Sequence, residues 1–184
     1  MTHARIRTAM NAIRRNIRVY VGVLLILMAG PTLTACQPSP PKPMVVGITG
    51  YNFTREGVQE YYVDGHRGSN LPPYGGGGSL SCCIALPRQW SSEQTVQLDW
   101  TIGHYTEPWE KRKHMSVEEE SACCWTQRSL SKSVPVQRYG SEGGGVQVFF
   151  LPDDEVRIYV TDYDLGHEKH PSGMAYPKKP AGFE

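Results

Sequence analysis

Residues 146–160 have the sequence VQVFFLPDDEVRIYV, the clearest structural pattern in the chain. Two runs of β-branched and aromatic residues flank Pro152-Asp153-Asp154, a group typical of a tight turn. The pattern therefore predicts a β-hairpin. Comparable runs predict further strands upstream, over residues 45–53, 58–63, 79–86 and 95–102. In the last of these, hydrophobic and polar residues alternate, which is the period of a half-buried antiparallel strand.

One segment predicts a helix instead. Ser116-Val117-Glu118-Glu119 has the pattern of a capping box, in which the serine and the second glutamate satisfy free backbone N–H groups of the first turn. We expect a short helix over residues 117–125. Residues 66–78 contain two prolines and four consecutive glycines, so we expect a loop there. The fold class that follows is mainly β: a single antiparallel β-sandwich-like domain with one short helix.

Composition limits the number of domains and the class of partner. The 184 residues are 39% hydrophobic, enough for one ordinary domain and too many for a wholly disordered chain. Residues 1–35 hold five of the 19 basic residues and no acidic one, which leaves 14 basic against 18 acidic residues, a net charge of −4. This balance excludes a nucleic-acid binder that depends on bulk positive charge.

The N-terminus is typical of an exported lipoprotein. Residues 19–30 form an apolar run after a basic segment, shorter than the about 20 residues that cross a bilayer. Leu33-Thr34-Ala35-Cys36 resembles the lipobox of bacterial lipoproteins, which implies cleavage before Cys36 and acylation of its thiol. Gln37, in place of Asp, implies sorting to the outer membrane. We expect a lipid-anchored protein on the periplasmic side of that membrane; an ordinary buried cysteine is the alternative.

The chain divides into four parts on these grounds. We expect a lipoprotein signal peptide at 1–35, the lipidated cysteine and a Pro-rich tether at 36–44, a β-rich domain at 45–170, and a polar C-terminal tail at 171–184 that lies over the surface or frays.

The other four cysteines form two adjacent pairs, Cys82-Cys83 and Cys123-Cys124. An even number of cysteines in an oxidising compartment predicts disulfides. A bridge between neighbours requires a strained geometry, so we expect two bridges that join one segment to the other and staple the domain; a single bridge is the alternative. A zinc site is less favoured, because the pairs lack the two-residue gap that lets two thiolates face one metal ion.

The sequence contains no complete catalytic motif. The chain has no G-x-S-x-G sequence, and His167-Glu168-Lys169-His170 is one residue too short for H-E-x-x-H. Asp162, Asp164, His167 and His170 leave open a metal-dependent hydrolase, although exposed turn residues are the better explanation for them. We expect no enzyme, no cofactor and no metal.

A family resemblance suggests a role. Gly50-Tyr-Asn-Phe-Thr54, the glycines at 75–78, Ser81-Cys-Cys-Ile-Ala-Leu-Pro87 and the hairpin at 146–160 resemble, in this order, a family of small proteobacterial lipoproteins over most of residues 47–171. Some members resemble immunity proteins that block phospholipase effectors of type VI secretion. The resemblance implies a protein that binds and neutralises such an effector. The alternative is an envelope lipoprotein that supports assembly of an outer-membrane or secretion complex.

The contact surface is expected in the two long loops, residues 66–76 and 104–120, because they carry aromatic and charged residues. We expect Tyr74, Trp109 and Glu110 to contact the protein partner. Packing in or beside the core is the simplest role for the tryptophans Trp90, Trp100 and Trp125. Trp109 follows Pro108 in a long charged stretch, so it is the tryptophan that we expect to face a partner.

Overall fold

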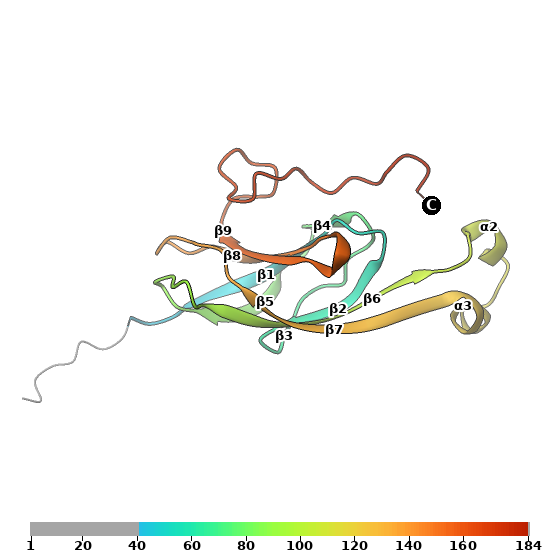
Figure 1. The fold of residues 1–184 in the computed structure, drawn as a ribbon, viewed down its shortest axis with the longest axis horizontal. Coiled ribbons are helices and arrows are strands. Elements are labelled where there is room, and N and C mark those ends of the chain that lie inside the picture. Colours follow the sequence, from blue (N-terminus) through green and yellow to red (C-terminus); the bar gives the residue numbers. More distant parts are fainter. Residues whose placement is uncertain (1–40, 184) are drawn as a thin grey trace, which may run out of the picture. The chain divides into compact units, whose positions relative to one another are not determined.

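Two β-sheets pack face to face in residues 41–183, the part of the chain that the computed structural model describes (Figure 1). The first sheet has the strand order β4-β1-β8-β9, with β5 also paired to β1; the second has the order β3-β2-β6-β7. The strands are β1 Met44–Asn52, β2 Gly57–Val63, β3 His66–Arg67, β4 Gly75–Gly76, β5 Ser81–Leu86, β6 Thr95–Tyr105, β7 Trp125–Pro135, β8 Gly145–Phe150 and β9 Val156–Thr161. The helical elements are α2 Trp109–Arg112, α3 Val117–Cys124 and the 3₁₀ turn η2 Pro152–Asp154.

The expected mainly β, sandwich-like fold is confirmed, with one difference in strand direction. Strands β1 and β8 run parallel, from Ile48 opposite Val146 to Asn52 opposite Phe150. The four strands of the second sheet come between β1 and β8 in the sequence, and β8 enters the first sheet at the same end as β1 does. The first sheet is therefore mixed and not purely antiparallel.

The predicted hairpin forms the centre and one edge of the first sheet. Strands β8 and β9 pair antiparallel, and Asp153 and Asp154 both adopt a positive φ, of 59° and 56°, in the turn. Aspartate tolerates this conformation better than most residues. Every residue of β8 from Val146 to Phe150 is buried, because one face of the strand meets the second sheet and the other meets the C-terminal segment.

The hydrophobic pattern failed to predict β7, an edge strand. It pairs with β6 along its whole length, from Trp125 opposite Tyr105 to Pro135 opposite Thr95. Val134 is the one residue of β7 that is fully buried. Serines, Lys132 and other polar residues occupy most of the exposed positions of this strand. An edge strand that faces solvent has no need of alternating hydrophobic residues.

The predicted helix is confirmed as α3, and the one-turn helix α2 precedes it. Ser116 Oγ accepts a hydrogen bond from the Glu119 N–H at 3.2 Å, and the Ser116 N–H donates to Glu119 Oε2 at 2.8 Å. The backbone hydrogen bond from Ser116 lowers the pKa of Glu119. Among residues 41–183, none of the helices is long and apolar enough to cross a bilayer.

The C-terminal segment covers the outer face of the first sheet (Figure 1). A second hydrophobic cluster lies beneath it, and Tyr176 packs edge-on against Tyr51 with ring centroids 5.7 Å apart. His170 is 4% exposed; its Nε2 lies 2.9 Å from Gln147 Oε1 and its Nδ1 lies 2.7 Å from Ser172 Oγ. Burial lowers the pKa of His170. The tail thus lies over the surface and is packed there.

Asn52 connects the two sheets through hydrogen bonds of a fully buried side chain. Its Nδ2 donates to the carbonyl of Glu56 at 2.7 Å and to that of Pro72 at 3.0 Å. Its Oδ1 accepts from the Thr54 N–H at 3.0 Å and from Thr54 Oγ1 at 2.8 Å. One amide therefore closes the turn from β1 into β2 and holds the loop around Pro72 against that turn.

The expected disulfide connectivity is wrong. The sulfurs of Cys82 and Cys83 are bonded to each other, as are those of Cys123 and Cys124. Cys82 and Cys83 lie on β5 in the first sheet, whereas Cys123 and Cys124 lie at the end of α3, which leads into the second sheet. The two pairs thus belong to different sheets, and each cysteine is bonded to its neighbour in the sequence. Neither bridge closes a long loop, so the chain-entropy stabilisation of a staple does not arise. Cys36 and the expected signal peptide at 1–35 lie outside the described residues.

This pairing has a direct chemical test. Digestion of the unreduced protein with trypsin should release residues 68–88 and 114–128 as two separate peptides, each lighter by two hydrogens than its reduced form. Each peptide contains one cysteine pair and no internal lysine or arginine. A single species that contains both peptides in covalent linkage would contradict the structure and restore the expected staple.

The role of Asn52 predicts a large loss of stability on truncation. Asn52→Ala removes a side chain that satisfies two carbonyls and one backbone N–H, and should lower the free energy of unfolding by about 3 kcal/mol. The exposed Asn70 supplies the matched control, because Asn70→Ala should change stability by no more than about 0.5 kcal/mol. Urea titration measures both values. Equal stability of the two variants would show that the Asn52 amide does not hold the turn.

Candidate interaction site

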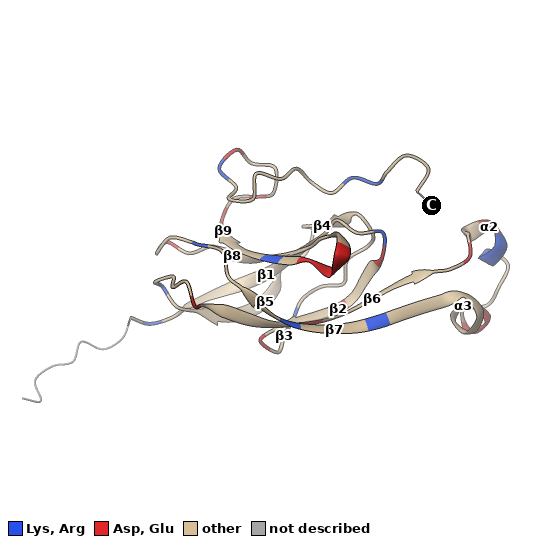
Figure 2. Ribbon diagram, in the orientation of Figure 1, with Lys and Arg blue, Asp and Glu red and all other residues tan. Residues whose placement is uncertain are grey.

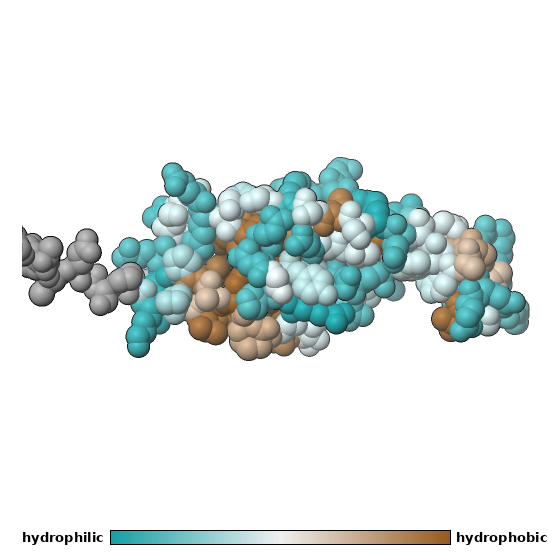
Figure 3. Space-filling model, turned by 90° about the horizontal axis from the view of Figure 1, so that it is seen from below, coloured by the Kyte–Doolittle hydropathy of each residue, from teal (hydrophilic) through white to brown (hydrophobic). Residues whose placement is uncertain are grey.

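A cleft of about 630 Å³ lies at the end of the second sheet that carries α2. Three segments far apart in the sequence form it: the β1–β2 turn with the neighbouring loop, the region from β6 to α2 together with the start of β7, and the C-terminal segment. Figure 3 shows hydrophobic side chains among hydrophilic ones at the helical end of the molecule. The residues that line the cleft are Arg55, Gly57, Gln59, Pro73, Gly103, His104, Tyr105, Thr106, Glu107, Pro108, Trp109, Arg112, Trp125, Lys179 and Phe183.

Aromatic side chains form one wall of the cleft. Tyr105 is 42% exposed and Trp109 is 54% exposed, large fractions for side chains of this size. Tyr105 packs edge-on against Trp125, with ring centroids 4.9 Å apart. A Cβ on Gly103 would lie 2.3 Å from the Trp125 ring, so only glycine leaves room for the indole to lie on the strand.

Arg112 holds the exposed aromatic side chains in place. The centre of its guanidinium group lies 3.6 Å from the centroid of the Tyr105 ring and 5.7 Å from that of the Trp109 ring. Its Nε donates to the carbonyl of Glu107 at 2.7 Å, and its Nη1 forms an ion pair with Glu120. Stacking of a cation on both rings, with its charge neutralised, fixes the rings before any partner arrives.

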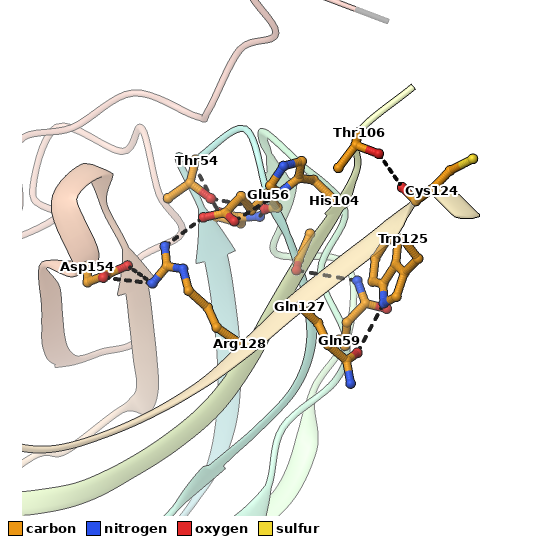
Figure 4. Close-up of polar contacts among 12 residues, drawn as sticks. Thr54, Glu56, Gln59, His104, Thr106, Cys124, Trp125, Gln127, Arg128 and Asp154 are labelled. Atoms are coloured by element: carbon orange, nitrogen blue, oxygen red, sulfur yellow. Dashed lines mark hydrogen bonds and ion pairs between the residues drawn. The ribbon is translucent and has the colours of Figure 1, made fainter. Parts of the chain in front are cut away.

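The end of α3 is tied to the same region. The carbonyl of Cys124 accepts hydrogen bonds from the Thr106 N–H at 2.7 Å and from Thr106 Oγ1 at 3.1 Å (Figure 4). The segment between β6 and α2 is therefore fastened to the α3–β7 junction, and the wall of the cleft has supports on both sides.

A chain of ion pairs beside the cleft joins the two sheets (Figure 4). Asp154 on η2 binds Arg128 on β7 at 2.7 Å; Arg128 binds Glu56 at 2.8 Å; and Glu56 Oε1 lies 3.0 Å from Nδ1 of His104. The hydrogen bond to Asp154 raises the pKa of Arg128. The chain fixes His104, which lines the cleft.

The C-terminal segment supplies the opposite wall with Lys179 and Phe183. The Phe183 ring packs edge-on against Tyr74 at 5.0 Å, and Lys179 Nζ lies 5.8 Å from the Phe183 centroid. Tyr74 follows Pro73, another lining residue, and adopts a positive φ of 50°. The two loops expected to contact a partner thus meet at one cleft.

The three predicted contact residues differ in their position relative to the cleft. Trp109 lines the cleft, and Tyr74 supports it through Phe183. Glu110 is exposed, forms an ion pair with Lys113 and is not among the lining residues.

Other lining residues were not singled out from the sequence. Tyr105 and Arg112 belong to the loop 104–120 but stand in no distinctive sequence pattern. The sequence predicts packing for Trp125 and a polar tail around Phe183. No local pattern in the sequence shows that these two come together.

The residues considered for a metal site have other contacts. His170 is engaged with Gln147 and Ser172 beneath the tail, and His167 stacks on Tyr163 with ring centroids 4.7 Å apart. Within residues 41–183, no three His, Cys, Asp or Glu side chains lie close enough together to hold a metal ion. These contacts make His170 a packing residue of the second cluster.

Comparison with known proteins gives a family and no activity. No curated protein and no solved structure matches the chain. One family model matches residues 51–158, which include Asn52, the ion-pair chain and the aromatic wall, and exclude Lys179 and Phe183. Because the match covers more than half of the sequence, the chain belongs to the family described as protein of unknown function, DUF3304.

Proposed function

We propose that this chain is a binding protein that holds a protein partner at the cleft. The observation that carries the proposal is the pair of exposed aromatic side chains, Tyr105 and Trp109, fixed by Arg112. Exposed aromatic residues at a recess are the type of side chain that contributes most to protein–protein affinity. Because stacking already orders these rings, binding loses little conformational entropy at them.

The proposed partner is a phospholipase effector of type VI secretion. The sequence resemblance to immunity proteins supports this choice. The lipobox at Cys36 supports a place on the periplasmic side of the outer membrane, where a phospholipase delivered by a sister cell would reach its substrate. Binding at the cleft would then neutralise the effector by covering its active site.

The test is co-purification of the mature chain with a type VI phospholipase effector of the organism that produces it, followed by a lipase assay. Cys36→Ser provides a soluble form, and it should no longer fractionate with membranes; a variant that stays with membranes would contradict the lipid anchor. A stable complex without lipase activity supports the proposal. Absence of a complex, or a complex with full activity, contradicts it and favours the assembly of an envelope complex.

Substitution of Trp109 tests the position of the interface. Trp109→Ala should weaken the complex about 30-fold, because truncation of a central aromatic side chain costs about 2 kcal/mol or more of binding free energy. Val117→Ala is the control: Val117 is 73% exposed on α3 and does not line the cleft, so affinity should be unchanged. Equal affinity of the two variants in calorimetry, with equal melting temperatures, would place the interface elsewhere.

A further inference from the structure

The cleft carries positive charge that the described part of the chain does not neutralise. Among residues 41–183, Arg55 and Lys179 line the cleft and form no ion pair. The other charged lining residues are compensated: Arg112 is paired with Glu120, and Glu107 is paired with Lys111 at 2.7 Å. Two exposed cations therefore face the opening without partners.

This positive charge is local. The chain after residue 35 carries a net charge of −4, so its surface as a whole repels anions. Figure 2 shows basic residues in α2 and in the C-terminal segment, and acidic residues in α3 and η2. An anionic group is therefore attracted only at the cleft, where it enters the recess between the three segments.

Aromatic rings stand beside the two cations. Tyr105, Trp109 and Trp125 form one wall, and Phe183 lies next to Lys179 on the other. A carboxylate bound by Arg55 or Lys179 would place a neighbouring side chain against these rings. The recess thus combines a site for one negative charge with a site for one apolar or aromatic group.

We propose that the cleft recognises a segment of the partner in which an aspartate or glutamate stands next to an aromatic or large apolar residue. This inference rests on the proposed function of the cleft as a protein-binding site and names the chemistry that it selects. A protein segment fits better than an anionic membrane surface. Exposed Glu118 and Glu119, which form no ion pair within residues 41–183, lie on α3 at the same end of the molecule. They repel an anionic membrane surface and leave room for a single inserted carboxylate.

Two short peptides that differ in one group test the proposal. The acidic probe is acetyl-Ala-Trp-Asp-Ala-amide, and the neutral probe replaces Asp with Asn. Nuclear magnetic resonance follows the indole N–H signals of the protein during titration. Trp109 and Trp125 report on the cleft, whereas Trp90, whose indole donates to the carbonyl of Val136 at 2.8 Å, serves as an internal reference. The acidic probe should bind about fivefold more tightly than the neutral one and shift the two cleft signals.

Charge variants identify the cations. Arg55→Gln with Lys179→Gln should remove the preference for the acidic probe. Arg67→Gln with Lys178→Gln changes the net charge equally at exposed residues that do not line the cleft, and should retain the preference. Equal affinity of the wild type for both probes, or loss of preference in both double variants, would overturn the proposal. So would shifts of the cleft signals by phosphatidylglycerol vesicles but not by the acidic probe.

These outcomes are independent of the lipase experiment. If the lipase does not co-purify but the acidic probe binds as expected, the chemistry of the cleft holds and the identity of the partner is wrong. If the lipase is inhibited but the probes bind equally, the interface exists and acidic recognition is wrong.

Discussion

The buried amide of Asn52 is the constraint on which the rest of the arrangement depends. It makes hydrogen bonds to the turn between β1 and β2 and to the loop around Pro72, at the point where the chain leaves the first sheet for the second. A buried polar side chain is tolerated only when its hydrogen bonds are satisfied, so this turn has little freedom. Arg55 and Glu56 stand in that turn. One contributes to the cleft and the other begins the ion-pair chain through Arg128 to Asp154.

The walls of the cleft depend on this turn, on the ion-pair chain and on two local features. Because Gly103 has no side chain, the Trp125 indole can lie directly against β6. Arg112, on α2, stacks on the rings of Tyr105 and Trp109. Each feature fixes an aromatic ring by contact with an element that is itself tied to the sheet. The result is a recess with ordered walls, which suits recognition of a partner better than a flexible loop would.

More of the fold than of the site is predictable from the sequence. Hydrophobic patterning located β1, β2, β5, β6, β8 and β9, because each of these strands buries at least one face, and the capping box located α3. It failed for β7, whose exposed edge needs no hydrophobic pattern, and for the pairing of Cys82 with Cys83. Trp109 was recognisable in the sequence from its surroundings. Phe183 was not, because its place beside Tyr74 depends on the path of the tail over the first sheet, a long-range contact that no local pattern encodes.

Hydrogen–deuterium exchange of the chain, free and bound to a phospholipase effector, is the sharpest test of the proposed interface. If the cleft is the interface, binding should slow amide exchange in residues 103–112 and 179–183 and leave residues 66–67 and 81–86, at β3 and β5, unchanged. Protection confined to β3 and β5, with unchanged exchange around Trp109 and Phe183, would contradict the account.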